Sequence, residues 1–324
     1  MKPKVIISSS VRNKLFETLN DIAEVRYSSF QKTEEFLREL EDAVAIIIGP
    51  EPVGEDLLER TPKLKVIARH GVGYDAVDVE ACTKREVYVT HTPGVLSAAV
   101  AELTMGLMLC LSRNIVYADH YVRTEWAEQK KALLHYGVDL ASKILGIIGL
   151  GRIGYEVAQR ARAFNMSLVY YDTIRKEEAE KELKIQYLSL DDLLKTSDFV
   201  TIHVPLTANT TCIIGEKELK LMKKTAYLIN TSRGPTIDET VLCKALEETW
   251  IAGAALDVFE KEPLPFESTL INMKNVVLTP HIGSFTIETR HAMVLSCIEN
   301  IRKVLQGEVP PDLVPEQKGK IFKK

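Results

Sequence analysis

Cysteine is scarce in this chain, and its placement argues against the structures that depend on it. The five cysteines, at positions 82, 110, 212, 243 and 297, are scattered along 324 residues, and no two of them form a C-x-x-C pair. Their odd number and wide spacing do not suit a disulfide framework or a zinc site. The pattern is typical of reduced thiols, so we expect a cytoplasmic protein that binds no metal.

Long apolar runs and an excess of basic charge are also missing. The apolar stretch 103–111 is much shorter than the roughly 18 residues that a membrane span needs. The start of the chain lacks the apolar core of roughly 7–15 residues that a signal peptide carries. A formal net charge of -4 offers no basic footprint for nucleic acid. We therefore expect a soluble protein whose partners include neither a membrane nor a nucleic acid.

The chain does contain strand-like apolar runs that alternate with helix-length amphipathic segments. Such alternation predicts parallel sheets that are covered by helices on both faces. Because so many strands would not fit comfortably in one sheet, we predict two doubly wound α/β domains. The predicted strands are 4–8, 23–27, 43–48, 65–69, 87–90, 143–149, 167–172, 197–204, 225–230, 252–258 and 275–279.

Two long helix candidates, 97–118 and 285–308, lie between and after the two series of strands. Residues 119–142 fit neither the helical nor the strand period, and we interpret them as an arm or a partner-binding loop. The helix candidates suggest that the second series of strands is inserted into the first domain. The predicted domains are 1–96 with 285–324, and 97–284.

The segment "GLGRIG" places Gly149, Gly151 and Gly154 between an apolar strand and a predicted helix, at G-x-G-x-x-G spacing. The first glycine permits a tight turn, the second lets backbone amides approach a pyrophosphate, and the third lets helix and strand pack closely. An ordinary glycine-rich turn has the same letters, so the context decides. The next strand ends in Asp172, eighteen residues after Gly154, where an acidic side chain binds the ribose of a dinucleotide. We therefore predict a Rossmann domain.

Asp172 also bears on the choice of cofactor. A carboxylate at this position repels the 2′-phosphate of NADP, so the sequence favours NAD. Arg175 and Lys176 follow closely, and their positive charges weaken this preference without reversing it.

Polar side chains follow the last predicted strands, at the edge where open α/β sheets bind ligands. Arg233 follows strand 225–230, and His281 follows Pro280, which ends strand 275–279. A guanidinium grips a carboxylate at two points, and an imidazole exchanges protons near neutral pH. Taken alone, however, a loop arginine is usually a surface residue, and a single histidine is usually structural. Neither residue identifies a site without the rest of the chain.

Four motifs, in their order and spacing, resemble those of the D-isomer-specific 2-hydroxyacid dehydrogenase family. They are "GLGRIG", "INTSRGP", "AGAALDVFEKEPL" and "LTPHIGS". In the first domain "RHGVGYDAVDVEA" and "HTPGVLSAAVAELT" are similar to further family signatures, so the resemblance covers essentially the whole chain. It implies an NAD-dependent oxidoreductase that acts on a small 2-keto acid. It also implies a flavodoxin-like substrate domain with an inserted Rossmann domain, and a homodimer.

The resemblance assigns roles to side chains and to one loop. His281 would be the general acid/base that protonates the carbonyl oxygen of the keto acid. Glu262 would pair with His281 and favour its charged form. Arg233 would hold the substrate carboxylate and polarise the carbonyl. The backbone amides of Val72 and Gly73 would add donors for the same carboxylate.

The resemblance also implies cofactor contacts. Asp257 would face the nicotinamide carboxamide, Thr104 would contact the cofactor, and His203 would pack near it. The histidines at 70, 91, 120, 135 and 291 belong to no comparable group, and we expect them to be structural or on the surface. The remaining implied cofactor positions are Gly149, Gly151, Arg152, Ile153, Gly154, Asp172, Val204, Pro205, Thr231, Ser232 and Gly283.

Three functions stay open within this resemblance. A D-3-phosphoglycerate dehydrogenase needs cations to bind the phosphate of its substrate, and in those enzymes one of these cations follows the third strand. In this chain the corresponding residues, 43–59, contain no basic residue. This favours glyoxylate or hydroxypyruvate, although Arg69 or Lys131 is an alternative phosphate ligand. A non-catalytic, NAD-sensing corepressor is the third hypothesis, and the short tail after the last motif argues against it.

Overall fold

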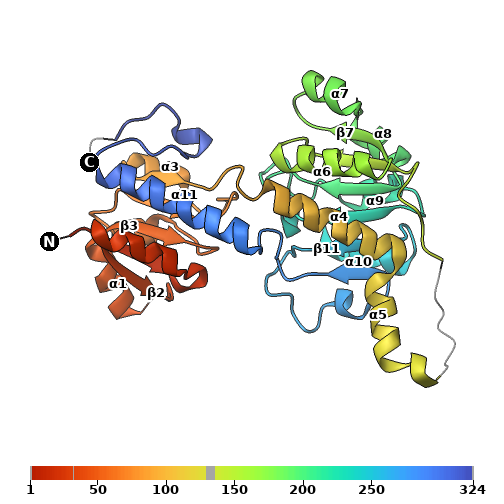
Figure 1. Ribbon diagram of the computed structural model, residues 1–324, viewed down its shortest axis with the longest axis horizontal. Helices are drawn as coiled ribbons and strands as arrows, with labels where there is room; N and C mark the ends of the chain where they lie inside the picture. The colour runs from red at the N-terminus through yellow and green to blue at the C-terminus, as the bar shows by residue number, and fades with distance from the viewer. Residues whose placement is uncertain (1, 32, 129–135, 323–324) are drawn as a thin grey trace. The chain divides into compact units, whose positions relative to one another are not determined.

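The computed structural model describes residues 2–31, 33–128 and 136–322. It divides the chain into two units, which we call unit 1 (Met1–Leu96 with Phe285–Lys324) and unit 2 (Ser97–Ser284). Each unit contains a parallel sheet with helices packed against it (Figure 1). The predicted fold class, two α/β domains with parallel sheets, is confirmed.

Within the described residues the sheet of unit 1 has five strands in the order β2-β1-β3-β4-β5. The order reverses between β1 and β3, which is the flavodoxin-like arrangement. Val5 and Ile7 of β1 face a core shared with η2 and α11, and Ile6 faces a core shared with α1, α2 and α3. The strands are β1 (Lys4–Ser8), β2 (Glu24–Ser28), β3 (Ala43–Ile48), β4 (Val66–Arg69) and β5 (Tyr88–Thr90). The helices are η1 (Ser9–Val11), η2 (Lys14–Asp21), α1 (Glu34–Glu41), α2 (Glu55–Glu59), α3 (Val79–Lys84), α11 (Ile287–Leu305) and η6 (Pro315–Gln317).

The described part of unit 2 has seven strands in the order β12-β11-β10-β9-β6-β7-β8. The order reverses between β6 and β9, as in a Rossmann fold with one added strand. Helices α4 and α6 pack on one face, and α8, α9 and α10 pack on the other. The strands are β6 (Ile144–Ile148), β7 (Ser167–Tyr171), β8 (Gln186–Tyr187), β9 (Phe199–Ile202), β10 (Tyr227–Asn230), β11 (Gly253–Leu256) and β12 (Val276–Leu278). The helices are α4 (Ser97–Arg113), α5 (Ile115–Thr124), η3 (Trp126–Glu128), α6 (Arg152–Ala163), α7 (Glu177–Leu183), α8 (Leu190–Thr196), α9 (Glu216–Leu221), η4 (Gly234–Thr236), α10 (Glu239–Glu247) and η5 (Thr269–Asn272).

The helix predicted over 97–118 is two helices in the structure, so that prediction is wrong at its end. Asn114 adopts φ 53°, in the left-handed region, and this interrupts the helical hydrogen bonds between α4 and α5. The two helices meet at an angle of 61°, and α5 leads away from the sheet (Figure 1). Part of the predicted arm, 129–135, lies outside the described residues.

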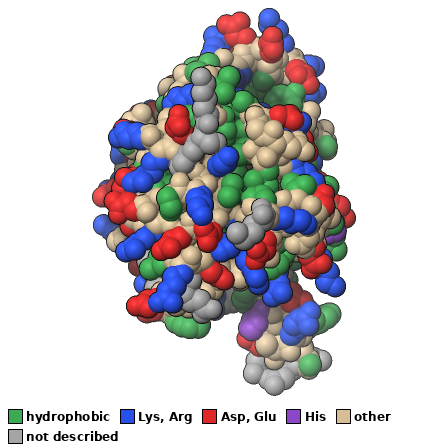
Figure 2. Space-filling model, turned by 90° about the vertical axis from the view of Figure 1, so that its left-hand side faces the viewer, with side chains coloured by type: hydrophobic (Ala, Val, Ile, Leu, Met, Phe, Trp, Pro, Cys, Tyr) green, Lys and Arg blue, Asp and Glu red, His purple; other side chains and the backbone are tan. Residues whose placement is uncertain are grey.

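Among the described residues, no single helix is both long enough and apolar enough to cross a membrane. Figure 2 shows acidic and basic side chains interspersed over one face of the molecule. On this face the charges are therefore mixed in sign instead of forming a field of one sign.

Candidate active site

The parallel strands of unit 2 bring residues that are distant in sequence to one edge of its sheet. The candidate residues follow the carboxyl ends of six strands, β6, β7, β9, β10, β11 and β12. This is the edge at which open α/β sheets bind ligands, beside the point where the strand order reverses. Thr104 is the exception among the unit 2 candidates, because it lies in α4.

The three glycines after β6 have distinct surroundings. Gly149 has φ +92°, and a Cβ atom there would lie 2.9 Å from the His203 carbonyl oxygen. A Cβ atom on Gly154 would lie 2.2 Å from the Gly149 carbonyl oxygen, so this glycine lets α6 pack against the turn. At Gly151, where α6 begins, no described residue comes within 4 Å of such a Cβ atom. The turn therefore fits a dinucleotide, with space at Gly151 for a diphosphate.

Asp172 lies at the mouth of this glycine turn, directly after β7. Its Oδ2 atom accepts a hydrogen bond from the Leu150 N–H at 2.9 Å, and its Oδ1 atom accepts one from the Thr173 hydroxyl at 3.3 Å. A carboxylate is thus held beside the first turn of α6, where Arg152 is exposed and Ile153 is partly buried.

The segment after β9 closes the turn from the other side. His203 contacts Gly149 through its backbone, and its Nε2 atom lies 2.9 Å from the Thr201 hydroxyl. Its Nδ1 atom is buried and has no hydrogen-bond partner among the described residues. Burial lowers the pKa of His203 to about 3, so the ring is neutral near pH 7. Val204 packs on Gly149, and Pro205 is exposed.

Arg233 sits on a loop that Asn230, the last residue of β10, organises. The Asn230 Oδ1 atom accepts hydrogen bonds from the Ser232 N–H at 3.0 Å and the Ser232 hydroxyl at 2.8 Å. The Asn230 amide donates to the Arg233 carbonyl at 2.9 Å. Gly234 packs so tightly on Phe259 that a Cβ atom would lie 1.9 Å from its carbonyl oxygen, which joins this loop to the next one. Sequence reasoning missed Asn230, although an asparagine that ends a strand before Thr-Ser is typical of such a turn.

Two buried threonines link α4 to β10. The hydroxyls of Thr104 and Thr231 lie 3.0 Å apart, and Thr104 also donates to the Val100 carbonyl at 2.8 Å. The structure thus brings these two predicted positions together.

Glu262 and His281 form a hydrogen-bonded pair between the loops after β11 and β12. The Nδ1 atom of His281 lies 2.7 Å from Oε2 of Glu262, and the side chains are 48% and 37% exposed. Burial alone would raise the pKa of the Glu262 carboxyl. The hydrogen bond and charge of His281, the hydrogen bond from the Phe259 N–H and the charge of Arg233 outweigh burial, so the pKa is lowered. An ionised carboxylate only accepts, so Nδ1 of His281 carries a proton, and Nε2 is the nitrogen left for a ligand.

Asp257 shapes the turn that carries His281. Its carboxylate accepts hydrogen bonds from the Thr279 hydroxyl at 2.6 Å, the Ile282 N–H at 2.8 Å and the Gly283 N–H at 2.9 Å. His281 itself has φ +53° and donates its N–H to the Asp257 carbonyl at 2.8 Å. A positive φ is uncommon for any residue other than glycine, although histidine adopts it more readily than most, so the Asp257 bonds stabilise a locally strained turn. Burial raises the pKa of Asp257, and these hydrogen bonds oppose the shift only in part.

The resemblance placed Asp257 against the nicotinamide. In the structure both of its carboxylate oxygens already accept hydrogen bonds from the His281 turn. Its clearest role in the structure is therefore to hold this turn. Sequence reasoning did not foresee that role, because the bonded donors lie more than twenty residues further along the chain.

Val72 and Gly73 belong to unit 1 and follow the carboxyl end of β4. The Val72 carbonyl lies 3.0 Å from Nδ1 of His91, so this predicted surface or structural histidine supports the loop. Arg69 ends β4 and donates to the His70 carbonyl at 2.5 Å. Lys131 and His135 lie outside the described residues. Among the residues that are described, no group of His, Cys, Asp and Glu side chains is arranged to hold a metal ion.

Comparison with known proteins identifies relatives of the whole chain. Residues 105–283, within unit 2, match the family model described as "D-isomer specific 2-hydroxyacid dehydrogenase, NAD binding domain". A glyoxylate reductase of Thermococcus litoralis is 46% identical over 324 positions, which cover 97% of this chain and 97% of the relative.

Solved structures give the same result at lower identity. A glyoxylate reductase from Paecilomyes thermophila has a TM-score of 0.89 and 32% identity, and the match covers 98% of this chain and 99% of that one. The NADPH-dependent glyoxylate/hydroxypyruvate reductase from Sinorhizobium meliloti, in complex with NADP and malonate, has a TM-score of 0.88 and 30% identity, with coverage of 100% and 99%. A similar structure thus holds NADP, so the comparisons leave the choice between NAD and NADP open.

Proposed function

The chain belongs to the D-isomer specific 2-hydroxyacid dehydrogenase family of oxidoreductases, and we propose that it reduces glyoxylate or hydroxypyruvate with NADH. The product would be the corresponding 2-hydroxy acid, of D configuration for hydroxypyruvate. The reaction class follows from the family, whereas the substrate, the preferred cofactor and the residue roles are our proposal.

The residues after β10, β11 and β12 supply what keto-acid reduction requires of the protein. Arg233 binds the substrate carboxylate with two parallel hydrogen bonds and stabilises the negative charge that develops on the carbonyl oxygen. The Nε2 atom of His281 donates a proton to that oxygen. Glu262 holds the ring and stabilises its charged form. When bound, a nicotinamide dinucleotide supplies the hydride.

The observation that carries this proposal is the 2.7 Å bond between His281, which follows β12, and Glu262, which follows β11. Strand β11 pairs with both β12 and β10, and Arg233 follows β10. The bond fixes which ring nitrogen is free for the substrate, and the charge of Arg233 acts on the same carboxylate. A histidine that served only packing would not need an ionised partner at a ligand-binding edge.

Unit 1 favours an unphosphorylated substrate. The loop after β3 carries Glu51, whose carboxylate accepts hydrogen bonds from the Ser8 hydroxyl, from the Ser10 hydroxyl at 2.6 Å and from the Gly49 N–H at 2.6 Å. A negative charge is therefore fixed at the carboxyl end of β3, where a phosphate would need a cation. This favours glyoxylate or hydroxypyruvate over the phosphorylated substrate of a D-3-phosphoglycerate dehydrogenase.

We further propose that the enzyme prefers NADH. Asp172 is tied to the glycine turn through the Leu150 N–H, so its charge stays where a 2′-phosphate would have to lie. The ribose hydroxyls of NADH, in contrast, would find an acceptor there.

We propose that the protein is a cytoplasmic homodimer and that α5 contributes to the contact between copies. The side chains of α5 and η3 leave several large apolar groups exposed, which is unusual for a helix that faces only water. They are Ile115, Val116, Val122 and Trp126. Light scattering on the purified protein tests this, and a monomer at micromolar concentration would contradict it.

The experiment that tests the function is a substrate panel. Purified protein is mixed with NADH and, in turn, glyoxylate, hydroxypyruvate, pyruvate and phosphohydroxypyruvate, and loss of absorbance at the NADH band is followed. We expect the highest kcat/KM with glyoxylate or hydroxypyruvate. Faster turnover of phosphohydroxypyruvate, or no turnover of any keto acid, would contradict the proposal.

A further inference from the structure

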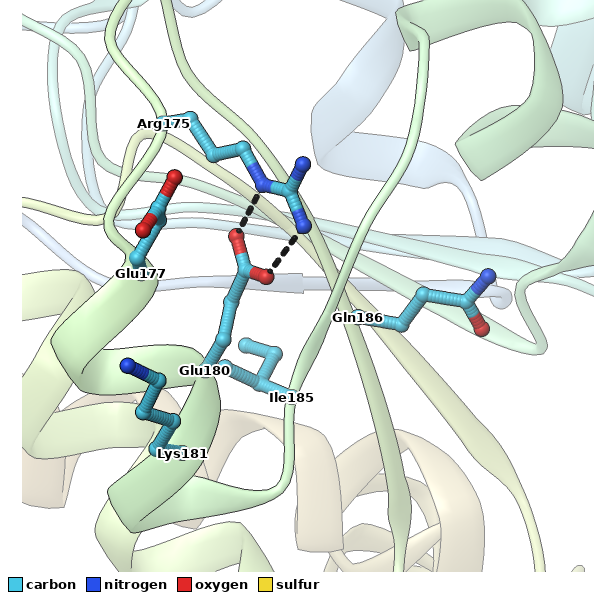
Figure 3. A pocket seen from close by; sticks show the side chains of 6 residues that line it. All are labelled: Arg175, Glu177, Glu180, Lys181, Ile185 and Gln186. Atoms are coloured by element: carbon cyan, nitrogen blue, oxygen red, sulfur yellow. Dashed lines mark hydrogen bonds and ion pairs between the residues drawn. The ribbon is translucent and has the colours of Figure 1, made fainter.

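Arg175 lies three residues after Asp172, in the loop where an arginine accommodates the 2′-phosphate in NADP-binding Rossmann domains. In the structure its guanidinium is engaged by Glu180 of α7 instead. Nε of Arg175 donates to Oε1 of Glu180 at 2.8 Å, and Nη2 donates to Oε2 at 2.8 Å, as the two dashed lines in Figure 3 mark. This is the two-point geometry with which an arginine also binds a phosphate.

Glu180 is the fixed member of this pair. Its Oε1 atom also accepts a hydrogen bond from the Tyr170 hydroxyl at 2.8 Å, and the Tyr170 side chain is fully buried in β7. The same hydroxyl accepts a bond from the Lys176 N–H at 2.7 Å. The Glu180 side chain is 15% exposed, whereas that of Arg175 is 59% exposed. The carboxylate is therefore held by a buried tyrosine, and the more exposed guanidinium binds to it.

Glu180 carries its charge at neutral pH. The bonds from Arg175 and Tyr170 lower the pKa of Glu180 to about 2. The carboxylate is consequently ionised at pH values well above 2.

Arg175 borders open space in addition to contacting Glu180. An open cavity of about 490 Å³ borders the pair. Figure 3 shows the Arg175 guanidinium turned toward Glu180. The cavity is lined by Arg175, Glu177, Glu180, Lys181, Ile185 and Gln186.

We propose that Glu180 sets the cofactor preference by withholding Arg175 from the 2′-phosphate of NADP(H). Glu180 occupies the Nε–Nη2 edge of the guanidinium and neutralises its charge. A 2′-phosphate would have to displace Glu180 from this edge or bind the remaining donors of a cation that is already paired with an anion. Asp172 repels the phosphate directly, and Glu180 removes the nearby cation that would otherwise attract it. Glu180 is a positioning residue, because it acts through Arg175. The inference rests on the proposed use of a nicotinamide dinucleotide.

The test is the affinity of Glu180→Gln for cofactor fragments, measured by calorimetry with adenosine 2′,5′-bisphosphate and with AMP. Glutamine keeps an acceptor for Tyr170 but loses the charge that holds Arg175. We expect adenosine 2′,5′-bisphosphate to bind about fivefold more tightly. This factor is the energy of a partly exposed ion pair converted into a ratio of dissociation constants. AMP, which lacks the 2′-phosphate, should change less than twofold.

Two further variants separate this account from simple charge removal. Glu177→Gln removes an exposed carboxylate from the same cavity and should leave the ratio of the two affinities within about twofold of the wild type. Arg175→Ala should weaken binding of the bisphosphate by less than twofold in the wild-type background, yet abolish the gain in Glu180→Gln. If Glu180→Gln does not fold, the Arg175→Ala result decides, because a large loss there would show that Arg175 is not withheld.

The outcomes distinguish this inference from the proposed function. No gain in Glu180→Gln, or an equal gain when Arg175 is absent, overturns the withholding account while NADH-dependent glyoxylate reduction can still be observed. If the wild type binds neither NADH nor NADPH, the proposed function fails instead.

Discussion

The Glu262–His281 pair and the Glu180–Arg175 pair lie in the same unit, on either side of the point where the strand order reverses. In the first, the carboxylate engages one ring nitrogen and leaves the other free. In the second, the carboxylate engages two nitrogens of a guanidinium at once. The first carboxylate therefore orients a ring whose second nitrogen is left for a ligand, whereas the second holds a guanidinium by one edge and neutralises its charge.

The largest effect is expected where the presented group is removed. His281→Ala should lower kcat for glyoxylate by about 10²–10⁴-fold, which is the usual contribution of general acid catalysis. NADH affinity, measured by fluorescence titration, should stay within about twofold, since no NADH contact is assigned to this side chain. His291→Ala, at an exposed histidine of α11, is the matched control. A near-normal rate in His281→Ala would refute the role of this residue.

Removal of Arg233 should come next. Arg233→Ala is expected to lower kcat/KM by about 10²–10³-fold, because a charged donor to the substrate is lost. Arg233→Lys should recover only part of this loss, since an ammonium cannot form two parallel bonds to a carboxylate. Steady-state kinetics over a range of glyoxylate concentrations measure both. Full activity in Arg233→Ala would show that Arg233 does not bind the substrate. Full activity in Arg233→Lys would contradict the two-point contact.

Glu262→Gln keeps the size of the side chain and removes its charge, and we expect about a tenfold loss of kcat. Because the pKa of Glu262 is lowered in the folded protein, its charge is complete above the ordinary value of 4.5 and is lost only as the pH falls through the lowered value. Between pH 5 and pH 8 the wild type thus keeps the Glu262 charge. The wild-type rate should lose the contribution of this carboxylate only below pH 4.5, and Glu262→Gln should lack that acidic step. The same acidic step in both enzymes would contradict this pairing.

The smallest effect concerns the cofactor side of the sheet. Asp172→Asn should raise the ratio of kcat/KM for NADPH over NADH by roughly threefold to tenfold, because the charge is lost while an acceptor for the Leu150 N–H remains. Asp172→Ala should in addition weaken NADH binding, because the glycine turn loses that hydrogen bond. An unchanged ratio in both variants would show that other residues select the cofactor.

Much of the fold could be predicted because the buried strands of a parallel sheet consist of continuous apolar runs. The strand β3 (Ala43–Ile48) coincides with its predicted range. The glycine spacing after β6 predicted a tight turn, and the structure has this turn. The strand β8 was missed, because two residues at the edge of a sheet leave no apolar pattern. The break at Asn114 was missed because the apolar pattern continues across it, and only a backbone angle marks the bend.

The grouping of the candidate residues at one sheet edge could be predicted from the sequence, but their hydrogen bonds could not. His281 and Glu262 follow strands whose ends meet at one sheet edge, so their proximity was expected from topology. The hydrogen bonds of Asp257 to the His281 turn depend on side-chain geometry across two strands, which no local pattern encodes. The Arg175–Glu180 pair likewise joins a loop to a helix, and sequence analysis treated Arg175 as a free cation.

One crossed measurement tests the distinction between the two pairs most directly: kcat/KM for glyoxylate with NADH and with NADPH in Glu262→Gln and in Glu180→Gln. We predict that Glu262→Gln lowers both values by the same factor and leaves their ratio unchanged. We predict that Glu180→Gln raises the NADPH/NADH ratio about fivefold. A changed cofactor ratio in Glu262→Gln, or an unchanged ratio in Glu180→Gln, would contradict the account.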